Sequence, residues 1–136
     1  IRAAAKLAAD LRDRGIDEAV SVNLAARQLR DTTLIDQLLA ELHAHDVSPR
    51  MIELEVTESG LINDIDATKR LLDALRAEGF TLALDDFGTG YSSLSYLESL
   101  PFDKVKLDRS FIRAVNVEDR SRRLVRGVVD LCAALG

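Results

Sequence analysis

Residues 52–57 read Ile-Glu-Leu-Glu-Val-Thr, and their alternation decides the fold class. Side chains alternate across a β-strand, so Ile52, Leu54 and Val56 face one side while Glu53 and Glu55 face the other. The segment is therefore predicted to be a strand with one apolar face and one acidic face.

Three further segments, 19–24, 81–86 and 104–108, show the same split. Their polar-face residues are Ser21, Asn23, Thr81, Asp85, Lys104, Lys106 and Asp108. A single polar residue of this kind is equally typical of a strand end that faces water. Four strands with the same pattern instead indicate a shared functional site at one end of a sheet.

Helical spacing of apolar residues fills the segments between these strands. The predicted helices are 2–14, 32 or 33 to 44, 63 or 64 to 79, a short one over 92–100, and 118–135. Thr32 or Thr33, and Asn63 or Asp64, are candidate N-caps, and Gly15 and Gly79 are candidate C-terminal residues. Alternating strands and helices predict right-handed βαβ units and a parallel α/β sheet, either doubly wound or closed into a barrel.

The acidic strand faces favour the barrel. Helices cover both faces of a doubly wound sheet, where carboxylates on three strands would be costly to bury. A barrel interior opens to solvent at one mouth, where barrel enzymes place their chemistry. Because a complete barrel needs about 250 residues, the fold class predicted for 136 residues is a partial (β/α)8 TIM-type barrel of about four parallel strands.

Composition indicates the number of domains in this sequence and the cellular compartment in which we expect them. It is 47% hydrophobic and 30% charged with a net charge of −5, which predicts one globular domain. Because it starts at Ile1, we expect the true N-terminus elsewhere. The single Cys132 cannot form an internal disulfide, and no apolar run reaches the roughly 20 residues that span a bilayer. We expect a cytoplasmic domain without direct membrane contact, and the dispersed basic residues disfavour a nucleic-acid polymer as partner.

Oxygen ligands gather at the predicted strand ends. Asn23, Glu55, Asp85 and Asp86 suit Mg²⁺ or Mn²⁺. Asp86 has the opposite strand parity to Asp85, so a bend at the strand end would be needed to bring both to neighbouring ions, and two ions are expected. Two metals about 3.5–4 Å apart activate water for phosphodiester hydrolysis. Lys106 is a candidate to assist that water, although taken alone it is typical of an ordinary ion pair.

The remaining chemical residues carry weaker signals. Gly88 and Gly90 indicate either a mobile loop over the metals or a simple turn, which Glu58 is placed to anchor. The side chains of His43 and His45 do not share a helix face, so we expect them in solvent, and Cys132 is predicted to be a small buried hydrophobic residue.

Four segments together resemble the EAL domain family: residues 20–29, 53–59, 85–94 and 104–111. The resemblance implies a modified (β/α)8 barrel that hydrolyses cyclic di-GMP to linear pGpG with Mg²⁺ or Mn²⁺. It covers essentially all of residues 1–136, which are interpreted as the central part of a single EAL domain. The strand with the Glu-Ala-Leu signature, whose Glu is a metal ligand in the family, is expected before Ile1, and the C-terminal strands, one of which carries another ligand Glu, are expected after Gly136.

The resemblance also implies roles for particular residues. Metal ligands would be Asn23, Glu55, Asp85 and Asp86; Lys106 would help activate water, Asp108 would support the site, Glu58 would hold the loop, and Gln28 would contact substrate. For Gln28, the alternative is a surface residue at the start of a helix.

Partners follow from the same resemblance. We expect cyclic di-GMP as ligand, a homodimer formed through residues 87–97, and flanking sensor or GGDEF domains, with residues 1–136 inactive when alone. Two alternatives remain open: a catalytically inactive EAL-like receptor or protein-interaction module, and another metal-dependent barrel enzyme such as an aldolase or phosphatase.

Overall fold

The computed structural model describes residues 1–61, 64–88, 99–110 and 119–135. Its helices and strands are, in chain order, α1 (Arg2–Asp13), β1 (Val20–Leu24), α2 (Leu34–His43), β2 (Ile52–Thr57), α3 (Ile65–Ala77), β3 (Thr81–Phe87), β4 (Lys104–Leu107) and α6 (Asp119–Leu135). Short 3-10 turns lie at η1 (Gln28–Arg30), η2 (Pro49–Met51) and η3 (Glu58–Leu61). These elements confirm the predicted order, while the predicted short helix at 92–100 falls almost wholly outside the described residues.

The four strands form one parallel sheet in the order β1-β2-β3-β4. Strands that follow one another in the chain are therefore neighbours in the sheet, as in a barrel, whereas a doubly wound sheet reverses its order at a switch point. In this register Asn23 lies beside Glu55, Glu55 beside Ala83, and Ala83 beside Lys104. The predicted partial barrel is confirmed for the described strands.

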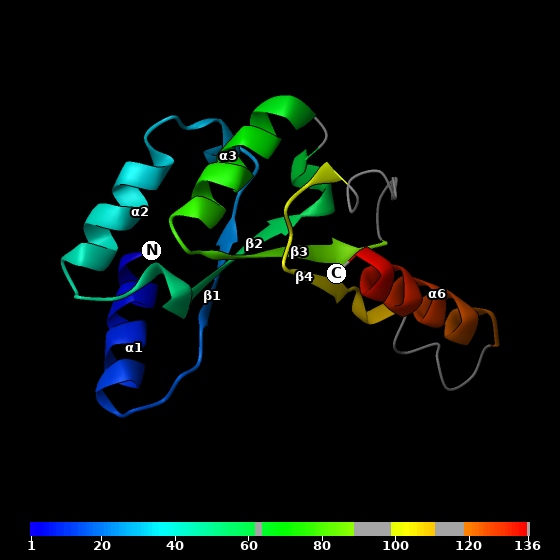
Figure 1. Ribbon diagram of the computed structural model, residues 1–136, viewed down its shortest axis with the longest axis horizontal. Coiled ribbons are helices and arrows are strands. Elements are labelled where there is room, and N and C mark those ends of the chain that lie inside the picture. The colour runs from blue at the N-terminus through cyan, green and yellow to red at the C-terminus, as the bar shows by residue number, and fades with distance from the viewer. Residues whose placement is uncertain (62–63, 89–98, 111–118, 136) are drawn as a thin grey trace.

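One face of the sheet holds the apolar core. Figure 1 shows α1, α2 and α3 together on one side of the sheet, with α6 projecting from the opposite end of the molecule. The core joins buried residues of these three helices to the apolar strand residues: Ala5, Ala8, Leu34, Leu38, Leu42, Leu72, Leu75, Ile52, Leu54, Val56, Leu82 and Leu84. The helices thus cover the apolar face that the alternation predicted, and the polar face is the other one.

Helix ends follow the predicted chemistry with one exception. The Asp64 carboxylate accepts a hydrogen bond from the Ala67 N–H at 2.9 Å, and Gly15 and Gly79 have left-handed φ angles of 72° and 99°. Thr33 occupies the N-cap position of α2 but makes no capping bond. Its hydroxyl lies 2.6 Å from Asp31, and this short-range bond to the preceding turn takes the place of the predicted cap.

A β-bulge interrupts the pairing of β3 with β4. Leu84 lies beside Val105 and Phe87 beside Leu107, so two residues, Asp85 and Asp86, span the interval opposite one residue of β4. Asp86 takes a left-handed φ of 54°, a conformation in which Asp is enriched among non-glycine residues. The bulge is a bend at the strand end of the kind that the opposite parities of the two aspartates require.

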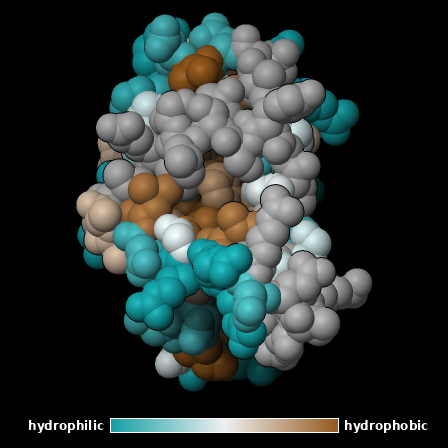
Figure 2. All heavy atoms as spheres, turned by 90° about the vertical axis from the view of Figure 1, so that its right-hand side faces the viewer, coloured by the Kyte–Doolittle hydropathy of each residue, from teal (hydrophilic) through white to brown (hydrophobic). Residues whose placement is uncertain are grey.

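The end of the molecule that carries α6 has exposed apolar surface. Figure 2 shows apolar side chains gathered in the middle of the face that lies at the α6 end. Leu124 and Val129 of α6 are 47% and 56% exposed, and β1 and β4 are the edges of the described sheet. Within the described ranges, no helix is both long enough and apolar enough to cross a membrane.

Candidate functional site

Two glutamates of β2 are buried on the polar face of the sheet. Glu53 is only 4% exposed and Glu55 only 8%. The Glu53 carboxylate accepts hydrogen bonds from the Ser21 hydroxyl at 3.0 Å and from the ammonium groups of Lys104 and Lys106, each at 2.6 Å. Lys106 also donates to Glu55. The buried negative charges are therefore matched by ammonium groups, which burial of a carboxylate requires.

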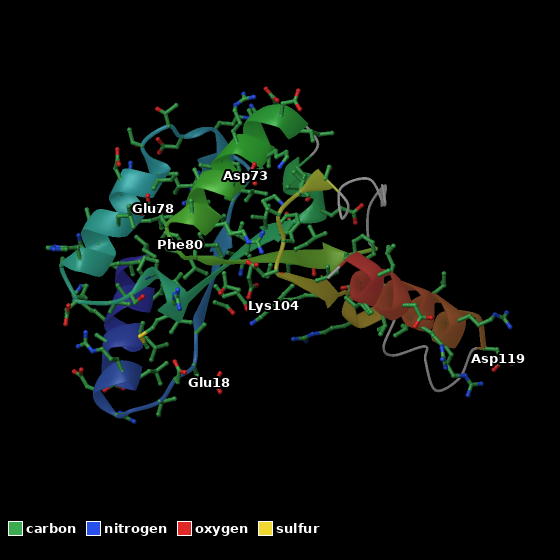
Figure 3. The ribbon with its side chains drawn as sticks, in the orientation of Figure 1. Glu18, Asp73, Glu78, Phe80, Lys104 and Asp119 are labelled. Atoms are coloured by element: carbon green, nitrogen blue, oxygen red, sulfur yellow. The ribbon has the colours of Figure 1, made fainter. Side chains whose placement is uncertain are left out.

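The two lysines reach these glutamates across a whole strand. Lys104 and Lys106 belong to β4, the glutamates belong to β2, and β3 lies between them. The residue of β3 level with Glu55 and Lys104 is Ala83, which is fully buried. Because strands are about 4.8 Å apart, a flexible lysine chain can bridge two strand spacings only where the side chain in between is small. Lys104 is labelled in Figure 3.

This contact network shifts the ionisation of its members. Burial raises the pKa of Glu53, but the hydrogen bonds from Lys104, Lys106 and Ser21 together lower it more, from 4.5 to about 2. Burial in turn lowers the pKa of Lys106, and the two glutamates outweigh it, so the net pKa of Lys106 is raised. Both groups are therefore charged near neutral pH.

The other predicted ligands lie at the carboxyl ends of neighbouring strands. Asn23 is exposed and sits beside Glu55, while Asp85 sits beside Thr57, one step further toward the strand end. Asp86 is exposed at the bulge. Among the residues that the structure describes, however, no three acidic, His or Cys side chains converge closely enough to hold a metal ion. The donors fit a hard divalent cation by chemical type and by strand position. In this structure the Glu55 carboxylate forms an ion pair with the Lys106 ammonium group.

Glu58 links the end of β2 to the end of β3. Its side chain is 3% exposed and accepts a hydrogen bond from the Gly88 N–H at 3.2 Å. Gly88 has a φ of 96°, which favours glycine, and it opens the segment that follows β3. The contact joins Glu58 to the first glycine of the predicted loop, and its role as an anchor stays a prediction; Gly90 lies outside the described residues.

Asp108 and Gln28 are engaged in local turns. The Asp108 carboxylate accepts from the Ser110 N–H at 2.9 Å, and its hydrogen bonds with Ser110 lower its pKa. The Gln28 side-chain oxygen accepts from the Ala25 N–H at 2.9 Å. These bonds show each side chain fixing the turn after its strand, so the predicted support and substrate roles remain predictions.

The remaining chemical residues do not join the site. His43 is exposed as expected, whereas His45 is partly buried with Nε2 3.6 Å from a Glu41 oxygen, so the expectation of a solvated side chain is wrong for His45. An i, i+4 contact with an acidic residue of α2 holds it there. Cys132 is only partly buried.

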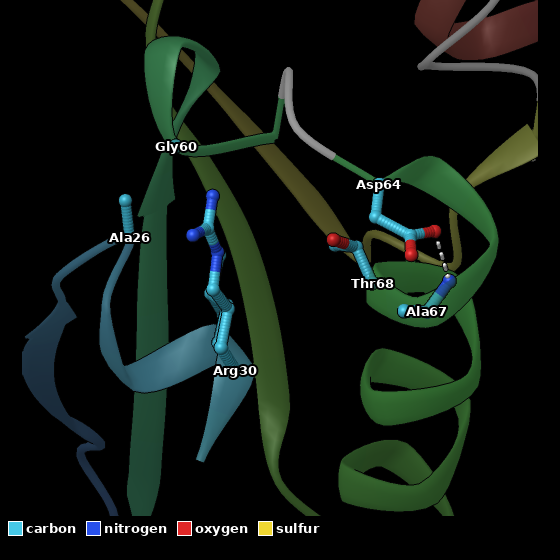
Figure 4. A pocket seen from close by; sticks show the side chains of 7 residues that line it. Ala26, Arg30, Gly60, Asp64, Ala67 and Thr68 are labelled. Carbon is cyan, nitrogen blue, oxygen red and sulfur yellow. Dashed lines mark hydrogen bonds between the residues drawn. The ribbon is translucent and has the colours of Figure 1, made fainter.

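A separate pocket has none of the predicted site residues in its lining. It has a volume of about 490 Å³ and is lined by η1, the Gly60 turn and the first turn of α3. Figure 4 shows the Arg30 side chain directed into it, with Asp64 and Thr68 on the opposite wall. The Asp64 carboxylate is already used as the cap of α3.

Sequence reasoning placed Glu53 and Lys104 on the polar face but gave them no part in the site. The structure shows that Glu53 binds the same ammonium group as Glu55. One signal was available: two acids at alternate positions of one strand, two lysines at alternate positions of another, and an alanine on the strand between them. What the sequence could not supply was the register that sets them level.

The fold and the polar face define a class of protein, in which a parallel barrel-type sheet carries acids and a lysine at the carboxyl ends of its strands. Comparison of the sequence with protein families then matches the EAL domain over residues 1–136. The chain belongs to the EAL domain family.

Curated relatives of known name are similar over most of this chain. It is 40% identical over 124 residues to the cyclic di-GMP phosphodiesterase PdeR of Escherichia coli, a match that covers 91% of this chain and 19% of PdeR. It is 40% identical over 116 residues to the cyclic di-GMP phosphodiesterase NbdA of Pseudomonas aeruginosa, with 85% of this chain and 15% of NbdA covered. The chain thus spans less than a fifth of the length of each.

Solved structures agree with the sheet and helices described above. The PaMucR phosphodiesterase in complex with c-di-GMP superposes with a TM-score of 0.90 at 37% identity, covering 98% of this chain and 55% of that one. The EAL domain of Mycobacterium smegmatis DcpA gives 0.90 at 33%, covering 99% and 61%. The manganese and cyclic di-GMP complex of Klebsiella pneumoniae BlrP1 gives 0.84 at 31%, covering 97% and 34%.

Proposed function

We propose that the full-length protein carrying this chain hydrolyses cyclic di-GMP to linear pGpG. The observation that carries the proposal is the joint position of Asn23, Glu55 and Asp85 on one face, at the carboxyl ends of three adjacent strands, with Lys106 bound to Glu55. Barrel enzymes place their reacting groups at this end. The names of similar EAL proteins supply the substrate.

The proposed cofactor is Mg²⁺ or Mn²⁺, with two ions. Bound divalent ions lower the pKa of a coordinated water and offset the charge that develops on the phosphodiester. The ligands from this chain would be Asn23, Glu55, Asp85 and Asp86. Carboxylate and amide oxygens are the donors that such cations prefer, and similar EAL structures contain manganese or calcium together with cyclic di-GMP.

The other side chains have supporting parts in this proposal. Lys106 brings a positive charge to the ligand Glu55, from where it orients the attacking water or offsets charge on the phosphate oxygens. Glu58 holds the backbone at Gly88, which fixes the segment that directly follows both aspartates. The bulge places two successive residues, Asp85 and Asp86, opposite one residue of β4 near the end of β3.

A product assay tests the proposal. Full-length protein is incubated with cyclic di-GMP and Mn²⁺ or Mg²⁺, and pGpG is followed by chromatography. We expect turnover that chelation removes and that Glu55→Gln abolishes, while Glu78→Gln, at an exposed position after α3, leaves turnover unchanged. Binding of cyclic di-GMP without product would favour the inactive receptor, and neither binding nor product would favour another barrel activity.

The unit that performs this reaction is proposed to be a complete EAL domain, of which residues 1–136 form the central part. Two observations support this: the chain covers 55–61% of two similar EAL chains, and apolar surface is exposed at the α6 end. We further propose that the domain is cytoplasmic and acts as a homodimer beside sensor or GGDEF domains. One similar protein, MucR, is named as a bifunctional diguanylate cyclase and phosphodiesterase.

A further inference from the structure

Glu53 lies one alternate position before Glu55 on β2, further from the carboxyl end of the strand. Both of its oxygens are used: one binds Lys106 and Ser21, and the other binds Lys104. It is 4% exposed, and the proposed reaction gives it no role.

We infer that Glu53 is a positioning residue that holds the Lys106 ammonium group beside the metal-binding carboxylate Glu55. The inference rests on the proposed function, because it concerns how Lys106 is presented to that reaction. It goes beyond the roles given above, none of which says what holds the lysine in place.

The reason is a conflict at Glu55. In this structure the Glu55 carboxylate binds Lys106, yet the same carboxylate is the proposed ligand of a divalent cation. A divalent cation at Glu55 repels the neighbouring Lys106 ammonium group. It also neutralises the carboxylate charge that attracts this ammonium group. Without a second anion, Lys106 would move away from the place where it is needed.

Glu53 supplies that second anion and is itself shielded from the metal. Its contact with Lys106 is 2.6 Å, and burial between two lysines and a serine leaves its oxygens committed. Lying a further alternate position from the strand end, it keeps Lys106 tethered when Glu55 changes partner. Partners of this kind behind a metal ligand typically alter metal affinity or activity about 10- to 100-fold when removed.

Lys104 provides a matched control. Its contact with Glu53 has the same length, 2.6 Å, but its side chain is 56% exposed and, within the described ranges, it forms no ion pair with Glu55. Removing Lys104 therefore disturbs the charge balance of Glu53 without breaking the bond between Glu53 and Lys106. A purely structural role of Glu53 predicts similar effects from losing either side of this pair.

The experiment compares Glu53→Gln, Lys104→Met and the charge-balanced double variant Glu53→Gln with Lys104→Met in the full-length protein. Two quantities are measured: the Mn²⁺ affinity by calorimetry without substrate, and kcat and KM for cyclic di-GMP. We expect Glu53→Gln and the double variant to lower both Mn²⁺ affinity and kcat by about 10-fold or more, with KM little changed. In those variants Lys106 competes for Glu55 and is no longer tethered, whereas Lys104→Met should match the wild type.

The outcomes separate this inference from the proposed function. A wild-type protein without turnover rejects the phosphodiesterase, and the Mn²⁺ isotherms still test Glu53. Normal kcat and Mn²⁺ affinity in the folded double variant, or equal losses in Glu53→Gln and Lys104→Met, overturn the positioning role. Adding Lys106→Met supplies a last check, because the effect of Glu53→Gln on Mn²⁺ affinity must vanish once the lysine is gone.

Discussion

Lowering the pH should reduce the stability of the folded protein by protonating Glu53, and Glu53→Gln should remove this part of the pH dependence. The pKa of Glu53 falls from 4.5 to about 2 in the folded state, so its contribution to stability is fully present above about pH 4.5 and is lost as the pH falls through about 2. The gap is about 2.5 pH units, and at about 1.4 kcal/mol for each it amounts to about 3 kcal/mol. Lys104 is 56% exposed, so solvent screening makes this an upper value.

The assay is urea unfolding of the complete EAL domain at a series of pH values. Near neutral pH we expect Glu53→Gln to be less stable than the wild type by up to about 3 kcal/mol. The difference should shrink between pH 4.5 and about 2, because a protonated Glu53 resembles glutamine in shape and charge. Glu78→Gln removes an exposed carboxylate and should follow the wild type throughout. A wild-type curve that stays parallel to that of Glu53→Gln would refute the reasoning, since the lysines would then not stabilise the charged form.

Three further predictions follow from single contacts. Ala83→Leu should destabilise the domain by about 1–3 kcal/mol in urea unfolding and abolish turnover, because its branched side chain blocks the path of the lysines over β3; an unchanged midpoint would count against that path. Lys106→Met should lower kcat while Mn²⁺ affinity holds or rises in calorimetry, because Glu55 is freed; a fall in affinity would contradict the competition between lysine and metal. Asp64→Ala should cost about 1 kcal/mol of unfolding free energy in thermal melts by removing the cap of α3, and Asp66→Ala, in the same first turn, serves as its comparison.

Local chemistry made most of the fold predictable from sequence. The alternation in 52–57 and its counterparts gave the strands and their polar face, and the capping pattern placed Asp64 and the left-handed Gly79 correctly. The failure at Thr33 was a choice between two nearby hydrogen-bond partners, which residue type alone does not decide. Likewise, the contact of His45 with Glu41 depends on side-chain packing around α2.

Site details depended on register, which pattern reading does not fix. The sequence placed Lys106 and Glu55 on the polar faces of their strands, but only the pairing of β2, β3 and β4 sets Ala83 level with Glu55 and Lys104 and lets the lysines cross it. The bulge is the second case. Opposite parity in a regular strand separates Asp85 from Asp86, and one extra residue in β3 changes that relation. Both features are long-range properties of the sheet.

The same register divides the polar face into a part where positive and negative charges offset one another and a part that is acidic. Toward the start of the strands, Glu53 meets both Lys104 and Lys106, so negative and positive charges offset one another where they are most buried. Toward the carboxyl end, Asp85 and Asp86 add two acids, the first partly buried and the second exposed, while Lys106 is shared between two glutamates behind them. Negative charge therefore accumulates at the rim and not inside the sheet. A divalent cation stabilises that arrangement most at the rim, which is where the strand ends place the oxygen donors and where a phosphodiester can reach them.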